Sequence, residues 1–519
     1  MGHVNPMLRV AMSSMKSALA AAALSAAWGC LAGGVPRARV VPDTSDDRVE
    51  APLCVRMERI GTIRPRSVSE IAGSNWMLGC ETLDRDYADF DEYKHLIAPL
   101  GLKTVRLQGG WWKTEREKGA YDFSWLDRIV DYLRENDVRI FMELSYGNPI
   151  YEGGGGWDLS GGFPFGEEGI AGWERWVDAI TTRYADKVAT WCVWNEPDIC
   201  DPSTPGGASP KTPEDIAAFN VRTAEIVRKN VPVGKARLAG LALARNDPKF
   251  LEKCLKAMGA GLGLFDAIVY HGYAPAPESS YENVERQREV LARYSPRAVL
   301  IQGENGCPSE YTSYFALNGW SWSEYSQAKW DIRRMLGDLG HDVEGNVFTI
   351  CDFNHVRHEV NRKGLVRANG SHEVIAIKRA YYAVQNVAAV FDDTLSRVKK
   401  PCFSTVDLGL EVYEYRTMEG LPVFAFWRSA AVSNPGKRAK GGLLKKEYVA
   451  PGDSFETAPG VFEMAAPPLA DPVWVDLLTG RIYAFPKKNQ LVHSDGVTFV
   501  DVPVYDSPCL LAERAAVMR

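Results

Sequence analysis

The sequence predicts an α/β protein: a (β/α)8 TIM barrel followed by a C-terminal antiparallel β-sandwich domain. Two patterns carry this prediction. Over residues 74–391, short apolar runs alternate with amphipathic helical segments, eight times in succession. After residue 391 the helical pattern stops, and short extended runs follow, separated by glycine, proline, asparagine and aspartate. Eight strand–helix units within roughly 320 residues favour a closed barrel over an open doubly wound sheet.

The eight predicted barrel strands are short apolar runs, as expected of parallel strands that are covered on both faces. The third helix is the clearest, because Ile170, Trp173, Val177 and Ile180 recur at helical spacing and form one apolar face. The predicted strands are residues 75–79, 104–108, 139–144, 190–195, 236–242, 267–270, 298–303 and 346–351. The predicted helices are residues 90–100, 124–135, 170–184, 213–230, 248–258, 281–294, 323–339 and 372–387.

The C-terminal part, residues 392–519, is expected to form the β-sandwich domain. Short alternating pieces in residues 53–73 are expected to join it, since the two ends of a barrel can lie close together. Residues 431–470 are rich in lysine, proline, alanine and glycine and are expected to form a long surface insertion with little core of its own. The predicted strands of this domain are residues 411–416, 423–427, 473–476, 481–484, 497–500 and 509–512.

Residues 1–30 have the features of a secretory signal peptide. Arg9 and Lys16 precede a run of small apolar residues, and residues 31–52 form a polar leader punctuated by prolines. We therefore expect a secreted or periplasmic protein. Cys30 stands where a lipoprotein is cleaved, although Trp28 replaces the small residue usual there, so a lipid anchor and a cell-surface lipoprotein stay open.

The composition is that of an ordinary globular protein, with 46% hydrophobic and 24% charged residues and a net charge of -6. An acidic chain without a long basic run is not expected to bind nucleic acid. Apart from the signal sequence, no apolar run is long enough to span a membrane. The ten cysteines and eight histidines show no CxxC, HxH or HExxH spacing, so we expect no metal, no disulfide framework and no cofactor.

Two glutamates close predicted strands. Glu196 closes the fourth, after the apolar run 191–194, and Glu304 closes the seventh. Pro197 ends the fourth strand and favours an extended backbone at Glu196. Because the carboxyl ends of barrel strands meet in one site, the two side chains are expected to face each other. Glycoside hydrolysis uses such a pair, in which mutual repulsion raises one pKa and leaves an acid beside an ionised carboxylate.

With Asn195 and Glu196 closing strand four and Glu304 closing strand seven, the sequence resembles clan A of the glycoside hydrolases, the retaining (β/α)8 enzymes. The resemblance covers roughly residues 70–390. It implies that Glu196 is the general acid/base and Glu304 the nucleophile. It also implies that Asn195 hydrogen-bonds the 2-hydroxyl of the sugar.

Residues on strands two and six extend the resemblance. Arg106, on the second strand, matches the arginine of the clan that holds the nucleophile ionised; an arginine in an apolar strand is costly unless paired, and a structural ion pair is the alternative. His271 and Tyr273, closing strand six, resemble the His-x-Tyr pattern of family 39 and its relatives, which implies a hydrogen bond from the tyrosine to Glu304. One departure lies at strand eight, where the clan often has a tryptophan and this chain has Cys-Asp-Phe-Asn at 351–354.

Other polar and aromatic residues follow the predicted strands on the same face. They are candidates to hydrogen-bond or stack on a sugar, and the alternative is that they are ordinary loop or core residues. Glu143 lies inside strand three and is expected to be a paired polar residue of the barrel interior rather than a third catalytic acid. The further candidates are Glu81, Gln108, Trp111, Tyr146, Asn148 and Trp320.

Together these features predict a retaining glycosidase that cleaves O-glycosidic bonds of oligo- or polysaccharides by double displacement, with a carbohydrate as its substrate. Two alternatives stay open: a transglycosylase using the same site, and a non-catalytic carbohydrate-binding protein on a glycosidase-like barrel. A metal-dependent barrel hydrolase is a third, and the absence of metal-ligand spacing argues against it.

Overall fold

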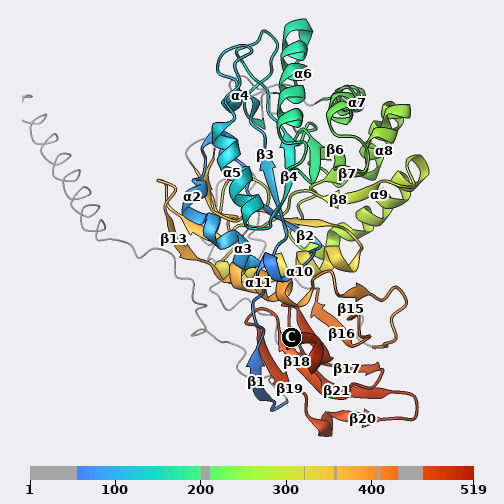
Figure 1. Cartoon of the computed structure of the whole chain (residues 1–519). Helices are drawn as coiled ribbons and strands as arrows, with labels where there is room; N and C mark the ends of the chain where they lie inside the picture. Colours follow the sequence, from blue (N-terminus) through green and yellow to red (C-terminus); the bar gives the residue numbers. More distant parts are fainter. Residues whose placement is uncertain are drawn as a thin grey trace, which may run out of the picture.

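The computed structural model describes residues 55–159, 162–199, 211–320, 322–355, 359–405, 409–429 and 460–518. Eight parallel strands form a barrel surrounded by helices, and antiparallel sheets form a second body below it in Figure 1. The predicted fold class is confirmed. The predicted signal peptide, the leader and Cys30 lie outside the described residues.

The barrel strands are hydrogen-bonded in the order β8-β7-β6-β5-β4-β3-β2-β9. The sheet closes where Ile301 forms a parallel bridge with Glu344, and where the Gln302 amide donates to the Glu344 carbonyl at 2.8 Å. The eighth strand ends at Val347, earlier than predicted. The strands are β2 (Trp76–Gly79), β3 (Thr104–Gln108), β4 (Arg139–Leu144), β5 (Thr190–Val193), β6 (Arg237–Leu243), β7 (Ala267–Tyr270), β8 (Val299–Gln302) and β9 (Gly345–Val347).

The surrounding helices bury the apolar face that their sequences predict. In the helix over Gly166–Arg183, Trp173, Trp176 and Ile180 are fully buried, and the next helix begins at a capping box formed by Thr212 and Asp215. The helices are α2 (Phe90–Tyr93), α3 (Ile97–Leu100), α4 (Trp111–Thr114), α5 (Ser124–Glu135), α6 (Gly166–Arg183), α7 (Pro213–Asn230), α8 (Pro248–Met258), α9 (Tyr281–Tyr294), α10 (Glu324–Gly340), α11 (Arg379–Val390) and α12 (Arg514–Val517).

The predicted helix over residues 372–387 is wrong at its start. β13 (Val374–Ile377) pairs with β12 (Val366–Ala368), and α11 begins only at Arg379. The β-branched run at 374–377 suits a strand better than a helix, and the turn before it places that run against β12. A second hairpin, β10 (Phe353–Asn354) with β11 (Val360–Asn361), also belongs to the long connection after β9.

The C-terminal domain is a sandwich of a seven-stranded sheet, β1-β19-β18-β22-β16-β15-β14, and a three-stranded sheet, β17-β21-β20. Phe424, Trp474 and Leu511 of the first sheet pack with Phe462 and Phe499 of the second in one apolar core. The strands are β1 (Glu58–Thr62), β14 (Ser396–Arg397), β15 (Leu410–Arg416), β16 (Pro422–Arg428), β17 (Gly460–Ala466), β18 (Pro472–Asp476), β19 (Arg481–Ala484), β20 (Gln490–Val492), β21 (Val497–Val504) and β22 (Cys509–Glu513).

Two segments bear on the predicted limits of this domain. β1 pairs antiparallel with β19, so residues 53–73 contribute an edge strand to the domain. β17 pairs with β21 and buries Phe462 and Met464, so the expectation of a coreless insertion is wrong for residues 460–470. Residues 431–459 of that predicted insertion lie outside the described residues.

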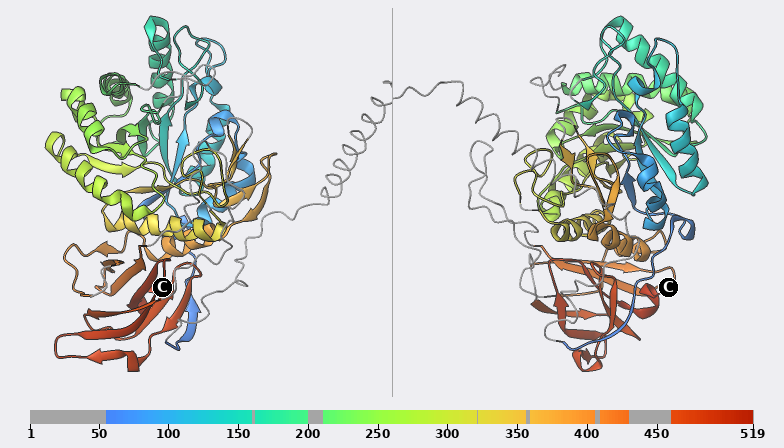
Figure 2. Two further views of the ribbon diagram at one scale, coloured as in Figure 1. Left: turned by 180° about the vertical axis from the view of Figure 1, so that it is seen from behind. Right: turned by 90° about the vertical axis from the view of Figure 1, so that its left-hand side faces the viewer.

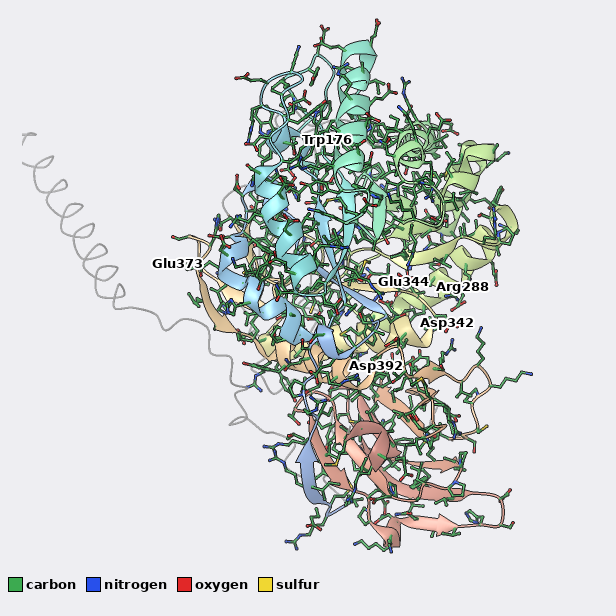
Figure 3. The ribbon with its side chains drawn as sticks, viewed as in Figure 1. Trp176, Arg288, Asp342, Glu344, Glu373 and Asp392 are labelled. Atoms are coloured by element: carbon green, nitrogen blue, oxygen red, sulfur yellow. The ribbon has the colours of Figure 1, made fainter. Side chains whose placement is uncertain are left out.

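The β domain lies against α10 and α11 of the barrel, as the two views of Figure 2 show. Lys329 of α10 forms an ion pair of 2.7 Å with Asp506, and both side chains are fully buried. Trp427 of β16 donates to Glu278 at 2.7 Å, and Asp392, labelled at the junction in Figure 3, accepts from Arg66. None of the described helices has the length and apolar character needed to cross a membrane.

Candidate active site

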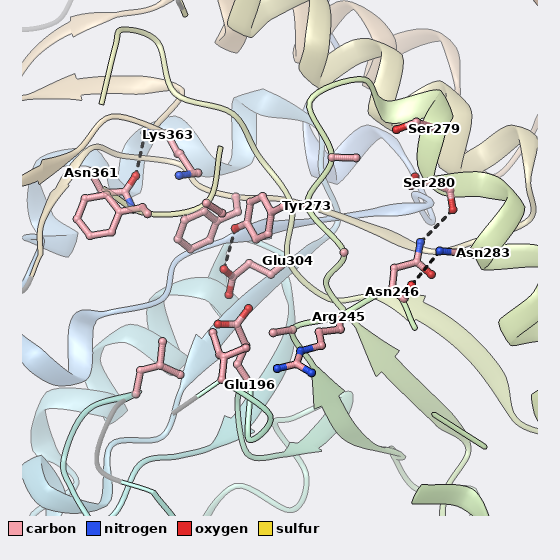
Figure 4. Close-up of a pocket in the computed structure, with 18 of the residues that line it drawn as sticks. Glu196, Arg245, Asn246, Tyr273, Ser279, Ser280, Asn283, Glu304, Asn361 and Lys363 are labelled. Atoms are coloured by element: carbon pink, nitrogen blue, oxygen red, sulfur yellow. Dashed lines mark hydrogen bonds between the residues drawn. The ribbon is translucent and has the colours of Figure 1, made fainter. Parts of the chain in front are cut away.

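Glu196 and Glu304 lie together at the carboxyl end of the barrel, just after β5 and β8. They line a cavity of about 630 Å³ and point toward each other in Figure 4. One oxygen of each carboxyl group and a ring nitrogen of His271 all lie within 4.8 Å of one another. The two glutamates are therefore close enough to act on the same bond of one substrate.

Glu304 has the surroundings of an ionised carboxylate. Burial favours its neutral form, but the charges of His271 and Arg106 outweigh this effect, and its pKa is lowered. Nη1 of Arg106 donates to Oε2 at 2.8 Å, and the hydroxyl of Tyr273 donates to Oε1 at 2.8 Å. Both hydrogen bonds stabilise the charged form, so the side chain is set up as a nucleophile.

Glu196 has the opposite perturbation. Burial raises the pKa of its carboxyl group and the charge of Glu304 adds to this, while the hydrogen bond with His271 opposes it. Nδ1 of His271 lies 2.7 Å from Oε1 of Glu196, and it lies 3.9 Å from Glu304. A buried carboxyl with a raised pKa beside an ionised one is the acid partner of such a pair.

The backbone at Glu196 differs from the expectation. Pro197 favours an extended backbone there, but the φ angle of Glu196 is +48°, in the left-handed region. Its amide donates to the carbonyl of Ala242 at 2.9 Å, which ties the end of β5 to the neighbouring strand β6. This hydrogen bond fixes the strained conformation, whose cost is of order 1 kcal/mol or more. Backbone strain of this kind often marks a functional position.

Arg106 is the centre of the buried polar network beneath the cavity. Besides Glu304, it donates to Glu81 at 2.6 Å, to Asn195 at 2.7 Å and to Glu143. Burial raises the pKa of Glu81 to about 7, against the effect of Arg106. Glu143 is paired inside the barrel, as expected, and Asn195 is positioned by the same guanidinium group that holds Glu304.

Gln108 and Tyr146 lie one layer below the cavity and do not line it. Nε2 of Gln108 donates to Glu143 at 3.0 Å, and Nδ2 of Asn195 donates to the hydroxyl of Tyr146 at 2.8 Å. Both side chains are buried. Their place in the network makes them supports for Asn195 and Arg106 rather than groups that contact a sugar.

Three predicted candidates do not line the cavity. Trp111 is fully buried and packs against Trp173 and against Trp176, which Figure 3 labels on α6. Asn148 is also buried and donates to the carbonyl of Glu115 at 2.8 Å, which fixes its own loop. Trp320 packs beside Trp322 and Trp330 and does not line the cavity. The sequence placed these residues after strands but could not show which way the loops turn their side chains.

The eighth strand ends earlier than predicted, and this changes which residue lies at the floor of the site. Because β9 ends at Val347, the residue that follows the strand is Phe348, which lines the cavity. A phenylalanine, and not the tryptophan that the resemblance suggests, therefore follows the eighth strand at the cavity. Cys351 and Asp352 are buried away from the cavity, and Asp352 pairs with Lys378 at 2.6 Å.

Several residues of the cavity wall could not be found from the sequence, because they come from loops and helix starts between the strands and belong to no motif. Arg245 lies beside Glu196, and Tyr273 and Lys363 lie on the side of Glu304 (Figure 4). The missed residues are Arg245, Asn246, Ser280, Asn283, Phe315, His355, Asn361 and Lys363.

Glu196, His271 and Glu304 are the one group of described residues whose donor atoms lie close enough together to hold a metal ion. A metal there would engage both carboxylates and leave no acid to donate a proton. Metal binding and acid–nucleophile chemistry are therefore mutually exclusive uses of this site.

Comparison with known proteins points to carbohydrate-active enzymes. The model of glycoside hydrolase family 42, described as beta-galactosidase, matches residues 84–149, a segment that includes Arg106 but neither Glu196 nor Glu304. No curated protein sequence matches the chain. Among solved structures, 606 chains match.

Three of these structures show the range of similar folds. A GH30 endoxylanase from Clostridium papyrosolvens C71 has a TM-score of 0.53 at 13% identity, over 87% of this chain and 98% of that enzyme. A monomeric beta-xylosidase from Caulobacter crescentus CB15 has a TM-score of 0.50 at 14% identity, over 88% and 97%. The family 51 alpha-L-arabinofuranosidase AbfB from Bifidobacterium longum has a TM-score of 0.50 at 12% identity, over 88% and 97%. At such identities the likeness concerns the fold.

Proposed function

We propose that this protein is a retaining glycoside hydrolase that cleaves O-glycosidic bonds by double displacement. One observation carries the proposal: oxygens of Glu196 and Glu304 lie within 4.8 Å of each other at the mouth of the barrel. Retaining glycosidases keep their two carboxyl groups about 5–5.5 Å apart, whereas inverting enzymes need about 6.5–9.5 Å to admit a water molecule between acid and base. The spacing favours retention.

In the first step, Glu304 attacks the anomeric carbon while Glu196 donates its proton to the departing oxygen. The sugar is then bonded to Glu304 through an ester, and the leaving group departs as an alcohol. The lowered pKa of Glu304 and the raised pKa of Glu196 suit these roles. Asn195, held by Arg106, is proposed to hydrogen-bond the 2-hydroxyl of the sugar.

In the second step, Glu196 is ionised and removes a proton from water, which attacks the same carbon and releases Glu304. Two inversions leave the anomeric configuration unchanged. An alcohol that takes the place of water gives transglycosylation at the same site, so the acceptor alone separates the two outcomes.

The comparisons support an O-glycosidic bond as the bond that is cleaved, and they do not identify the sugar. The matched family model and the similar structures carry the names of a galactosidase, a xylanase, a xylosidase and an arabinofuranosidase, which share O-glycosidic bonds and differ in the sugar. The aromatic ring of Phe348 in the cavity wall also suits a sugar, whose C–H edges pack on aromatic faces.

The direct test is to trap the intermediate. Incubation with activated 2-deoxy-2-fluoro glycosides is expected to add one sugar to the protein, and peptide mass spectrometry is expected to place it on Glu304. The Glu304→Ala variant is the control: it should not be labelled, and azide should restore turnover with inverted configuration. Wild-type activity in Glu304→Ala would overturn the proposal. Sugar binding without labelling or turnover would favour a non-catalytic binding protein.

We also propose that the protein is exported, to the periplasm or outside the cell, on the basis of the signal features in residues 1–30. Cell fractionation and the mass of the mature N-terminus test this. A mass increase equal to a diacylglycerol at Cys30 would establish a lipid anchor, and an intact N-terminus in the cytoplasm would exclude export.

A further inference from the structure

The cavity wall on the side of Glu304 contains a buried ammonium group. Lys363 follows β11, lines the cavity and is 2% exposed. Its Nζ has no hydrogen-bond partner among the residues that the structure describes. Burying a cation without a partner is costly, so unpaired lysines of this kind are rare in structural roles.

The neighbouring basic residues show that a buried cation without an ion-pair partner is not a general feature of the connection after β9. Arg362 pairs with Asp352 at 3.1 Å, Lys378 pairs with Asp352 at 2.6 Å, and Arg367 pairs with Glu324 at 2.9 Å. Carboxylates are thus supplied to the cations on either side of Lys363. Lys363 alone among these four side chains is left without one, and it is the only one of them that lines the cavity.

The backbone of Lys363 is held in place from several directions. Its carbonyl accepts from Nε2 of Gln327 at 3.1 Å and from the amide of Thr349 at 3.3 Å. Nζ lies 5.8 Å from the ring centre of Tyr273 and 5.9 Å from that of Phe315, so two aromatic rings of the cavity wall flank it. The side chain is therefore directed to the cavity by a fixed backbone.

Lys363 is charged at neutral pH. Burial lowers the pKa of its ammonium group to about 8, while Cys307, Glu304 and Glu196 oppose this effect. Below pH 8 the group is mostly a cation. Neither glutamate forms an ion pair with it, since both have their own partners in Arg106, Tyr273 and His271.

The side of the cavity decides which part of a substrate Lys363 would meet. The nucleophile attacks the sugar that becomes bonded to the enzyme, and the acid protonates the leaving group. Lys363 lies on the side of Glu304 and Tyr273, whereas Arg245 lies beside Glu196 (Figure 4). Lys363 therefore faces the glycone, the sugar that becomes bonded to Glu304, and Arg245 faces the leaving group.

We infer that the glycone carries an anionic group, the carboxylate of a uronic acid or a sulfate ester, and that Lys363 pairs with it. This inference rests on the proposed glycosidase function and adds the charge of the substrate to it. The anion would supply the partner that Lys363 lacks among the described residues, and because the ammonium group is buried, a charge-assisted hydrogen bond to it is strong. The uronate and the sulfate ester both place a negative charge on the glycone, and they differ in the chemical group that bears the charge.

The test uses pairs of aryl glycosides that share one configuration and differ only in charge: glucuronide with glucoside, galacturonide with galactoside, and 6-sulfated with unsulfated glycosides. In at least one pair, the wild type is expected to have the higher kcat/KM on the charged member. Lys363→Met should lower this charged-to-neutral ratio about 10- to 100-fold, as expected for the loss of a hydrogen bond between charged groups. The preferred pair distinguishes carboxylate from sulfate.

Arg245→Gln is the matched control, because Arg245 is a cation of the same cavity on the leaving-group side, and it should leave the ratio unchanged with a neutral aryl leaving group. A wild-type preference for the neutral member in every pair overturns the inference. So does an equal loss on both members in Lys363→Met. Lys363→Met removes an unpaired buried charge, so it is expected to fold, and its Tm checks this.

Failure of the inference and failure of the proposed function give different results. A higher kcat/KM on the neutral member of every pair, together with labelling of Glu304, keeps the glycosidase and rejects the anionic glycone. If no glycoside is turned over and Glu304 is not labelled, the proposed function fails. Calorimetry with glucuronate, galacturonate and glucose 6-sulfate then tests the anion site separately from catalysis. Binding that is tighter than that of glucose or galactose, and that is lost in Lys363→Met, supports the anion site. Equal binding of charged and neutral sugars rejects it.

Discussion

The hydroxyl of Tyr273 donates a hydrogen bond of 2.8 Å to Oε1 of Glu304, while Arg106 donates to the other oxygen. Tyr273 follows β7 and Glu304 follows β8, so adjacent barrel strands supply donor and acceptor. The carboxylate is thus held by two donors from opposite sides of the site. Its lowered pKa and its fixed orientation have the same cause.

Tyr273→Phe removes one of these two hydrogen bonds. We expect kcat/KM to fall about 10- to 100-fold, since a hydrogen bond to a charged group contributes about 1.5–3 kcal/mol. The tyrosine lowers the pKa of Glu304, so its loss should also move the acidic limb of the pH profile to higher pH. Tyr415→Phe is the control, because the Tyr415 hydroxyl is buried in the β domain without a hydrogen bond among the described residues. An unmoved acidic limb would contradict the assignment.

His271→Asn should shift the whole pH profile. The histidine lowers the pKa of both Glu196 and Glu304, so removing its charge should raise both. Glu304 must be ionised and Glu196 protonated, so the acidic and basic limbs of kcat/KM are both expected to move to higher pH. His341→Asn, which removes a histidine bonded to Glu285 away from the cavity, should leave both limbs in place. Movement of the limbs in opposite directions would speak against this electrostatic account.

Glu196→Ala removes the proposed acid/base and should affect substrates unequally. Glycosides with poor leaving groups are expected to lose about 10²–10⁴-fold in kcat/KM, while those with activated leaving groups lose far less in the first step. Azide should accelerate the second step and yield a glycosyl azide of retained configuration, the opposite of the Glu304→Ala product. Proton NMR of the azide adducts distinguishes them. Equal losses of kcat/KM for good and poor leaving groups would show that Glu196 is not the general acid.

Gly306→Ala tests how the floor of the cavity is held. A Cβ atom at Gly306 would lie 1.8 Å from the carbonyl oxygen of Phe348, so one of the two backbones must move. We expect a loss of about 1–3 kcal/mol in the free energy of unfolding and a lower kcat/KM as Phe348 is displaced. Gly263→Ala is the control, since nothing lies within 4 Å of its Cβ position. Denaturant unfolding gives the stability, and unchanged values for Gly306→Ala would contradict the packing.

Much of the barrel could be read from the sequence because each strand and helix carries its own pattern. Strands β3, β4 and β7 and helices α5, α7, α8 and α9 begin and end at the predicted residues. The clearest failures came in the long connection after β9, where a hairpin replaces the start of a predicted helix. The β-branched residues at 374–377 favour a strand only weakly by themselves, and pairing with β12 decides the outcome.

The sequence by itself determined the order of the barrel elements and, through the rule that strand ends meet, the pairing of Glu196 with Glu304. The resemblance to clan A also implied the contacts of Arg106 and Tyr273 with Glu304, which the structure shows. Only the tertiary structure decided which other side chains reach the cavity. Trp111 and Asn148 are buried away from the cavity, while Phe348 and Lys363 line it. The physical reason is that strand ends are placed by the periodic barrel, whereas loop side chains are directed by contacts between segments far apart in the chain, which no local pattern encodes.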